Sequence, residues 1–200
     1  MSSPITIVFV LGPPGAGKGT LCKRIAAETD WCHISIGDCL RQLSNSNTQR
    51  FAGLTLRDMQ AWLQSRALLP PEVTTAVIAH MIGLEQQREG GKRHFLIDGY
   101  PRTVPAAVLF ELDIGKPAMV VLFECPKDVA GSRFVNRQRE DDDDAGMFER
   151  RYGEFERLNP EIWERYAEVG KKVSSHVESE ALMQILTWTA RHKCRRFGCV

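Results

Sequence analysis

The sequence predicts an α/β fold built on a doubly wound, parallel, five-stranded sheet. Unbroken apolar and β-branched runs at residues 5–11, 95–97 and 119–123 are typical of strands that are buried on both faces. Shorter runs at residues 33–36 and 172–176 bring the expected number of strands to five. Helical patterns separate these runs, and strands that alternate with helices imply parallel pairing within one sheet.

The helical patterns suggest how the chain is organised. They cover residues 18–29, 38–44, 56–64, 72–88, 105–112, 127–139, 148–169 and 179–193. Residues 38–88 hold mostly helical pattern and no convincing strand, so we expect a small helical insert within a single domain that spans residues 1–200. Residues 138–146 are polar and acidic and lie between two helices, which predicts a short mobile loop.

Composition excludes several classes of protein. The net charge is only +1, which argues against a protein that binds nucleic acid through bulk charge. No apolar run approaches the roughly 20 residues of a membrane helix. We also find no signal peptide, so we expect no membrane association and a cytoplasmic location, with the nucleus as the alternative. The six cysteines form no C-x-x-C pair, which favours reduced thiols. We expect a monomer.

The segment between the first strand and the first helix reads GPPGAGKGT, residues 12–20, and fits the pattern G-x-x-x-x-G-K. Glycines let backbone N–H groups turn toward a phosphate, and the helix N-terminus adds a partial positive charge. Lys18 can reach the outer phosphates as a point charge. We therefore expect a nucleoside triphosphate to bind here, and an ordinary glycine-rich turn is the alternative. The residues concerned are Gly12, Gly15, Ala16, Gly17, Lys18, Gly19 and Thr20.

Two oxygen-bearing side chains are candidates for binding Mg²⁺. Thr20 carries the hydroxyl that the pattern usually has one residue earlier, where Gly19 stands, so the ion would be held partly through waters. Asp98 follows another apolar strand, and the carboxyl ends of parallel strands converge on the ligand crevice. For Asp98, a simple turn residue is the alternative.

Several arginines predict a second anionic site. Arg102 closes the segment IDGYPR, and a guanidinium binds phosphate bidentately. Arg41 opens the helix after the third strand candidate and would face the same crevice, with an ordinary surface arginine as the alternative. Further arginines flank the acidic loop, although a solvated, charge-neutralised face explains them equally well. They are Arg133, Arg137, Arg139 and Arg151. Two phosphate sites suggest phosphoryl transfer between two bound anions, which needs positioning and charge neutralisation.

With these motifs the chain resembles the adenylate kinase family of nucleoside monophosphate kinases, most closely its eukaryotic UMP-CMP kinase branch. The resemblance rests on GPPGAGKGT at residues 12–20, SIGDCLR at 35–41, LPPEVT at 69–74 and FLIDGYPR at 95–102. It implies the reaction ATP + NMP ⇌ ADP + NDP with Mg²⁺, and a preference for UMP and CMP, then AMP. It also implies a monophosphate-binding insert at residues 38–88 and a short lid at residues 138–146.

The resemblance implies roles for individual residues as well. Catalytic roles fall to Lys18, Arg102, Arg137, Arg139 and Arg151. The residues implied to bind the acceptor are Ser35, Ile36, Arg41, Leu69, Thr74, Gly99, Arg102 and Ala106, and Thr20 and Asp98 are implied for magnesium.

Three positions depart from the pattern of the family. Ala106 stands where the family usually has the Gln or Asn that reads the acceptor base, Ile36 where it has Thr or Ala, and Arg66 where it often has Gly. These changes motivate a second hypothesis, a nucleotide-binding protein with degenerate or weak kinase activity. A third hypothesis is a kinase for another small acceptor. Arg102 argues against this hypothesis, because its guanidinium suits an acceptor that already carries a phosphate.

Overall fold

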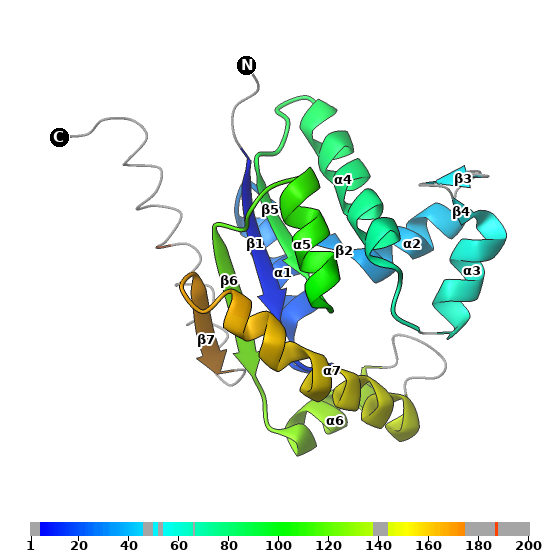
Figure 1. Cartoon of the computed structure of the whole chain (residues 1–200), viewed down its shortest axis with the longest axis vertical. Coiled ribbons are helices and arrows are strands. Elements are labelled where there is room, and N and C mark those ends of the chain that lie inside the picture. The colour runs from blue at the N-terminus through cyan, green and yellow to red at the C-terminus, as the bar shows by residue number, and fades with distance from the viewer. Residues whose placement is uncertain are drawn as a thin grey trace.

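A five-stranded parallel sheet forms the centre of the protein, in the strand order β2-β5-β1-β6-β7 (Figure 1). The computed structural model describes residues 5–45, 50–51, 54–65, 67–137, 144–174 and 187. The strands are β1 (Thr6–Leu11), β2 (Trp31–Ser35), β5 (His94–Asp98), β6 (Met119–Glu124) and β7 (Gly170–Ser174). Each neighbouring pair runs parallel, so the predicted doubly wound α/β fold is confirmed.

Helices lie on both faces of this sheet. They are α1 (Lys18–Glu28), α2 (Ile36–Asn45), α3 (Leu56–Ser65), α4 (Pro71–Gln87), α5 (Val104–Asp113), α6 (Lys127–Asn136) and α7 (Ala145–Arg165). None of the helices in the described ranges is long and apolar enough to cross a membrane. Apart from residue 187, the helix predicted at residues 179–193 lies outside the described residues.

The apolar strand residues form two cores because successive side chains point to opposite faces. On one face, Phe9 of β1 packs among residues of α4 and α5, with its ring centroid 5.0 Å from that of Phe110 and 5.4 Å from that of Tyr100. On the other face, Val8 and Val10 pack against α1 and α6. The unbroken apolar runs therefore match strands that are buried on both sides.

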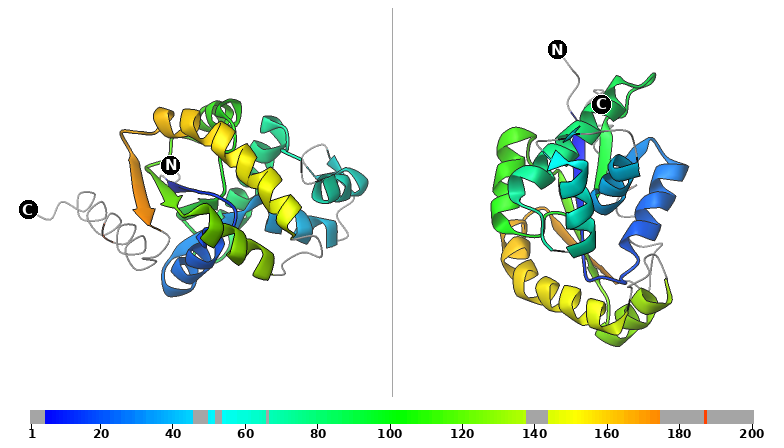
Figure 2. Two further views of the ribbon diagram at one scale, coloured as in Figure 1. Left: turned by 90° about the horizontal axis from the view of Figure 1, so that it is seen from below. Right: turned by 90° about the vertical axis from the view of Figure 1, so that its right-hand side faces the viewer.

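Helix α7 contributes to both cores. Phe148 and Tyr152, near its start, pack with α1 and α6, whereas Ile162, near its end, and Tyr166, which follows it, pack with α4 and α5. It therefore crosses the carboxyl end of the sheet, as Figures 1 and 2 show. This path brings the middle of α7 over the carboxyl ends of the strands, where the ligand-binding loops of parallel sheets lie.

The segment predicted as a helical insert contains a short hairpin as well. Strands β3 (Arg50–Phe51) and β4 (Leu54–Thr55) pair antiparallel between α2 and α3. Two residues a strand are too few to show alternation, so the sequence pattern did not indicate them. Helix α4 packs on the main sheet through Val77, Ile78 and Ile82, while α2, α3 and the hairpin extend to one side (Figure 1).

A charged cluster joins the end of α7 to α5. The carboxylate of Glu111 accepts hydrogen bonds from Arg165 Nη2 at 2.8 Å, Arg165 Nε at 3.2 Å and the Tyr166 hydroxyl at 2.7 Å. Burial opposes ionisation of Glu111, but these hydrogen bonds and the charges of Arg165 and Lys116 outweigh it and lower the pKa of the carboxyl. The cluster therefore anchors the C-terminal end of α7, which is remote from the carboxyl ends of the sheet strands.

We expect Glu111→Gln to destabilise the protein by about 2 kcal/mol at neutral pH, because a charged hydrogen bond contributes about 1.5–3 kcal/mol. The pKa of Glu111 is lower in the folded state, so its stabilising effect is present above the unfolded pKa and lost as the pH falls through the folded pKa. Urea unfolding of both proteins should therefore show a difference at neutral pH that shrinks in acid. A difference that stays constant into the acid range would contradict this role.

Candidate active site

A cavity of about 810 Å³ opens at the carboxyl end of the sheet, between the loop after β1, the start of α2, the loop after β5, and helices α6 and α7. It gathers almost all the predicted site residues. Those that line it are Gly12, Gly15, Gly17, Lys18, Gly19, Thr20, Ser35, Ile36, Arg41, Leu69, Thr74, Asp98, Gly99, Arg102, Ala106, Arg137 and Arg151. Ala16, which belongs to the loop at residues 12–20, is buried, and Arg139 and Arg66 lie outside the described residues.

The cavity is strongly basic although the whole chain carries a net charge of only +1. Among the described residues, seven cationic side chains line it: Lys18, Lys23, Arg41, Arg102, Arg133, Arg137 and Arg151. Two carboxylates, Asp98 and Glu154, face them. Such a concentration of positive charge suits polyanionic ligands, and the volume lies within the range of about 300–1,000 Å³ that is usual for ligand pockets.

The loop at residues 12–20 takes the form that the sequence predicts. Gly17, the N-cap residue of α1, has φ +89°, a conformation that L side chains rarely adopt. Lys18 Nζ donates hydrogen bonds to the carbonyl oxygens of Gly12 and Pro13, both at 2.8 Å. The N–H of Ala16 is bonded to the Pro13 carbonyl at 3.2 Å, so it serves the turn itself. The loop thus wraps the lysine ammonium at the N-terminus of α1, where a phosphate is favoured.

Lys18 lies among other charges that converge on this point. Burial lowers the pKa of its ammonium group to about 8, Asp98 opposes the shift, and Arg102 and Arg151 lower the pKa further. The four side chains come from α1, the end of β5, the loop that follows β5, and α7. The fold therefore brings the two predicted anion sites into electrostatic contact.

We expect the affinity for ATP to fall as the pH rises above about 8, because the unbound protein then loses the Lys18 proton that a polyanion favours. The decline should approach about tenfold per pH unit, since the bound phosphates raise the pKa of the lysine again. Calorimetric titrations from about pH 7 to about pH 9.5 measure it. A Lys18→Arg variant retains its charge over this range and should give a flatter profile. Constant wild-type affinity up to the highest pH would contradict the assignment.

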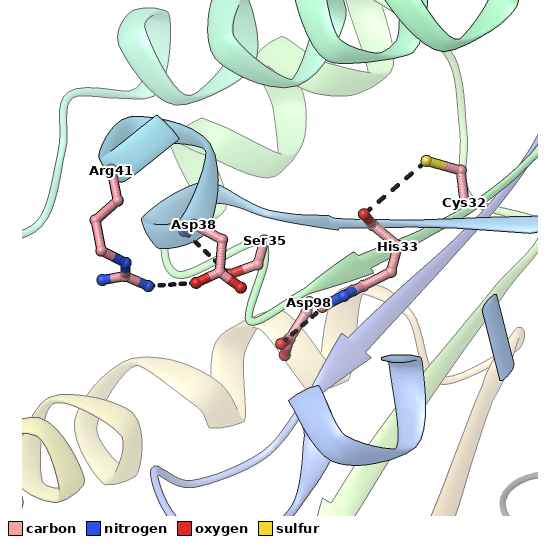
Figure 3. A network of polar contacts seen from close by, with 6 residues as sticks. All are labelled: Cys32, His33, Ser35, Asp38, Arg41 and Asp98. Atoms are coloured by element: carbon pink, nitrogen blue, oxygen red, sulfur yellow. Dashed lines mark hydrogen bonds and ion pairs between the residues drawn. The ribbon is translucent and has the colours of Figure 1, made fainter. Parts of the chain in front are cut away.

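A histidine that sequence reasoning missed holds Asp98. His33 Nε2 lies 3.3 Å from Asp98 Oδ2, and both side chains are nearly buried, with 9% and 11% of their surfaces exposed (Figure 3). The contact joins residues 65 positions apart, through the parallel pairing of β2 with β5 that sets Ser35 opposite Asp98. The imidazole fixes the direction of one carboxylate oxygen beside the phosphate loop.

The position of Asp98 explains why the loop has Gly19 where the usual pattern has serine or threonine. A Cβ atom at this position would lie 3.1 Å from Asp98 Oδ2, which is tighter than most contacts of that kind. A serine or threonine would therefore push on the carboxylate that His33 orients. Glycine lets α1 approach Asp98 closely, and the hydroxyl of Thr20 lines the cavity instead.

The two arginines predicted for the acceptor both line this cavity. Arg41 pairs with Asp38 within the first turns of α2, and the backbone N–H of Asp38 is 3.5 Å from Ser35 Oγ (Figure 3). Arg102 Nε donates to the Gly99 carbonyl at 3.3 Å. Burial lowers the pKa of the Arg102 guanidinium, against the charges of Glu154 and Asp98. Arginine remains protonated in proteins, so Arg102 presents a cation to the cavity.

The remaining part of the cavity is largely apolar. Ile36, Leu69 and Ala106 line it. The hydroxyl of Thr74 is bonded to the carbonyl oxygens of Pro71 at 2.9 Å and Pro70 at 3.3 Å within its own helix. Sequence reasoning missed several further lining residues, among them Trp62, Leu63 and Phe155. Their patterns are those of ordinary helix faces, so only the tertiary structure reveals that they reach the site.

Comparison with known proteins agrees with this geometry. The family model described as "Adenylate kinase" matches residues 10–174. The chain is 31% identical over 194 residues to a UMP-CMP kinase of Lentinula edodes, a match that covers 91% of this chain and 84% of the relative. It is 30% identical to the uridylate kinase of Saccharomyces cerevisiae, with 84% and 81% covered. It is 33% identical to adenylate kinase isoenzyme 1 of Caenorhabditis elegans, with 87% and 81% covered. The chain therefore belongs to the adenylate kinase family of nucleoside monophosphate kinases.

Proposed function

We propose that this chain transfers the γ-phosphoryl group of Mg-ATP to a nucleoside monophosphate, with UMP and CMP preferred and AMP next. The observation that carries the proposal is that one cavity joins the loop around Lys18 to the arginines Arg41 and Arg102. The loop supplies N–H groups and an ammonium for a triphosphate, and the arginines suit the phosphate of an acceptor. Relatives named UMP-CMP kinase and uridylate kinase support the pyrimidine preference.

The donor atoms around Asp98 fit a magnesium ion. No group of three or more His, Cys, Asp or Glu side chains within the described ranges could hold a metal by itself. Mg²⁺ is commonly bound through one or two protein oxygens, with waters and substrate phosphates as the other ligands. Asp98 and Thr20 line the same cavity and supply such oxygens. Magnesium, when bound, would neutralise negative charge on the phosphates.

The chain's own residues would act by positioning and by charge. Lys18 and the loop hold the triphosphate, while Arg41 and Arg102 hold the acceptor phosphate whose oxygen attacks the γ-phosphorus. The bond from that phosphorus to the bridging oxygen of ADP breaks as the new bond forms. Arg137 and Arg151 line the cavity and would offset the charge on the transferring oxygens. We expect Arg139 to join them, and it lies outside the described residues.

Selection of the acceptor base would depend chiefly on shape. Ile36, Leu69 and Ala106 offer carbon atoms at the apolar part of the cavity, and the hydroxyl of Thr74 is engaged by its own helix. An apolar pocket discriminates by only about 10–200-fold, whereas a pocket that hydrogen-bonds its substrate reaches far higher ratios. We therefore expect a graded preference among bases.

A coupled assay with AMP, UMP, CMP, dCMP and GMP tests the proposal. We expect turnover with all of the ribonucleotides that bind, and the highest kcat/KM with UMP or CMP. Measurable binding of ATP without turnover of any acceptor would favour the second hypothesis, a nucleotide-binding protein with degenerate activity, which the residues at 36, 66 and 106 motivate. Faster turnover of acceptors that lack a phosphate would contradict both.

A further inference from the structure

Two of the cavity arginines lie over one aromatic ring. The guanidinium carbon of Arg137, just after α6, is 3.9 Å from the centroid of the Phe134 ring, and that of Arg151, on α7, is 5.7 Å from the same centroid. The Phe134 side chain is fully buried. Both arginines line the cavity beside the phosphate loop.

This arrangement has a physical consequence for the two cations. The face of an aromatic ring carries negative potential and attracts a guanidinium within about 6 Å of the ring centroid. Two arginines that approach the same phosphate repel each other and have many rotamers to lose. A ring that attracts both reduces the repulsion between them and restricts their side chains before the phosphates arrive.

The Phe134 ring is itself held firmly. Its centroid is 5.7 Å from that of Phe148, which in turn is 5.3 Å from that of Tyr152, so the three rings join α6 to α7. Gly131, one turn before Phe134, allows close contact, because a Cβ atom there would lie 3.0 Å from the Phe148 ring. These contacts belong to the buried core beneath α1 and α6.

Helix α6 is also fixed against the phosphate loop. A Cβ atom at Gly15 would lie only 2.0 Å from the Ala130 carbonyl oxygen, so the loop and the α6 backbone touch directly. Phe134 comes one turn after Ala130 on the same helix. A continuous packed path therefore runs from the triphosphate loop through α6 to the ring beneath the two arginines.

We propose that Phe134 is a positioning residue for phosphoryl transfer, and that its ring holds Arg137 and Arg151 together at the transferring phosphate. This inference rests on the proposed function, because it assigns the two arginines to that phosphate. It predicts that the electrostatic character of the ring, beyond its bulk, contributes to kcat.

Fluorinated phenylalanines test this directly, since they keep the shape of the ring while they weaken its attraction for cations. We expect kcat to fall stepwise from the mono- to the trifluoro ring at position 134, by about threefold to tenfold in total, with little change in the KM for ATP. The same series at Phe148 is the matched control. In the described part of the chain the Phe148 ring packs at a tilt against Phe134 and Tyr152 and has no guanidinium over it.

The series is repeated in a variant with Arg137→Gln and Arg151→Gln, where the stepwise loss should vanish. Thermal unfolding of each protein shows whether a loss in rate reflects a loss of fold. A constant kcat along the Phe134 series, or an equal decline along the Phe148 series, would overturn the role of the ring while the proposed kinase function stood. A wild-type protein that turns over no monophosphate would overturn both.

Discussion

Replacing Lys18 or Arg102 with alanine is expected to lower kcat/KM by at least about 1.5–3 kcal/mol of transition-state stabilisation, the contribution of one hydrogen bond to a charged group. Both cations line the cavity, and desolvation is the main cause of the lowered pKa of each. Their removal leaves phosphate charge without a partner. Lys18→Ala should mainly lower the kcat/KM for ATP, and Arg102→Ala should mainly lower the kcat/KM for the monophosphate.

Steady-state kinetics with each substrate varied in turn shows which substrate each variant affects. Arg24→Ala is the matched control, because Arg24 pairs with Glu28 on the exposed side of α1 and does not line the cavity. This variant should leave the kcat/KM for ATP and the kcat/KM for the monophosphate unchanged. Near wild-type kcat/KM for Lys18→Ala or for Arg102→Ala, measured on the best monophosphate, would show that the residue has another role.

Gly15→Ala is expected to destabilise the protein by at least about 3 kcal/mol, or to displace the loop so far that ATP no longer binds. The residue has φ +82°, and its Cβ atom would lie 2.0 Å from the Ala130 carbonyl oxygen. Backbone on both sides of this contact leaves no flexible side chain that could move away. For a chain of this size, such a loss lowers the Tm by about 6–12 °C.

Gly90→Ala separates the two causes of that loss. Gly90 has φ +72°, but no atom lies within 4 Å of a Cβ built there, so this variant carries only the conformational cost, about 1 kcal/mol. Thermal unfolding and calorimetric titration with ATP compare the pair. If Gly15→Ala lost no more stability than Gly90→Ala and bound ATP normally, the contact between the loop and α6 would not be the constraint that we describe.

The parts of the fold that follow local rules were predictable from sequence. The unbroken apolar runs predicted β1, β5 and β6, because strands buried on both faces need no alternation. The outer strands β2 and β7 were predicted from shorter runs and are only partly buried. Helix starts were less accurate. Helix α7 begins at Ala145, earlier than predicted, because the carboxylate of Asp144 accepts a hydrogen bond from the Met147 N–H at 2.7 Å. Gly146, a poor helix former, hides this cap in the sequence.

Contacts between distant segments were not predictable in the same way. The pairing of His33 with Asp98 depends on the register between β2 and β5, which a single sequence does not specify. The position of Phe134 beneath Arg137 and Arg151 depends on how α6 and α7 pack. The motif residues were found because phosphate binding needs particular residue types at fixed spacing, whereas these supporting side chains follow no such pattern.

The most direct test of the account is calorimetric titration with a bisubstrate mimic, two nucleosides bridged by a phosphate chain. In the proposed function, a triphosphate at Lys18 and a monophosphate at Arg102 occupy one cavity, which both residues line. One mimic per chain should therefore bind, at least about tenfold more tightly than ATP, because the second half binds at high effective concentration. Affinity equal to or weaker than that for ATP would contradict two adjacent phosphate sites.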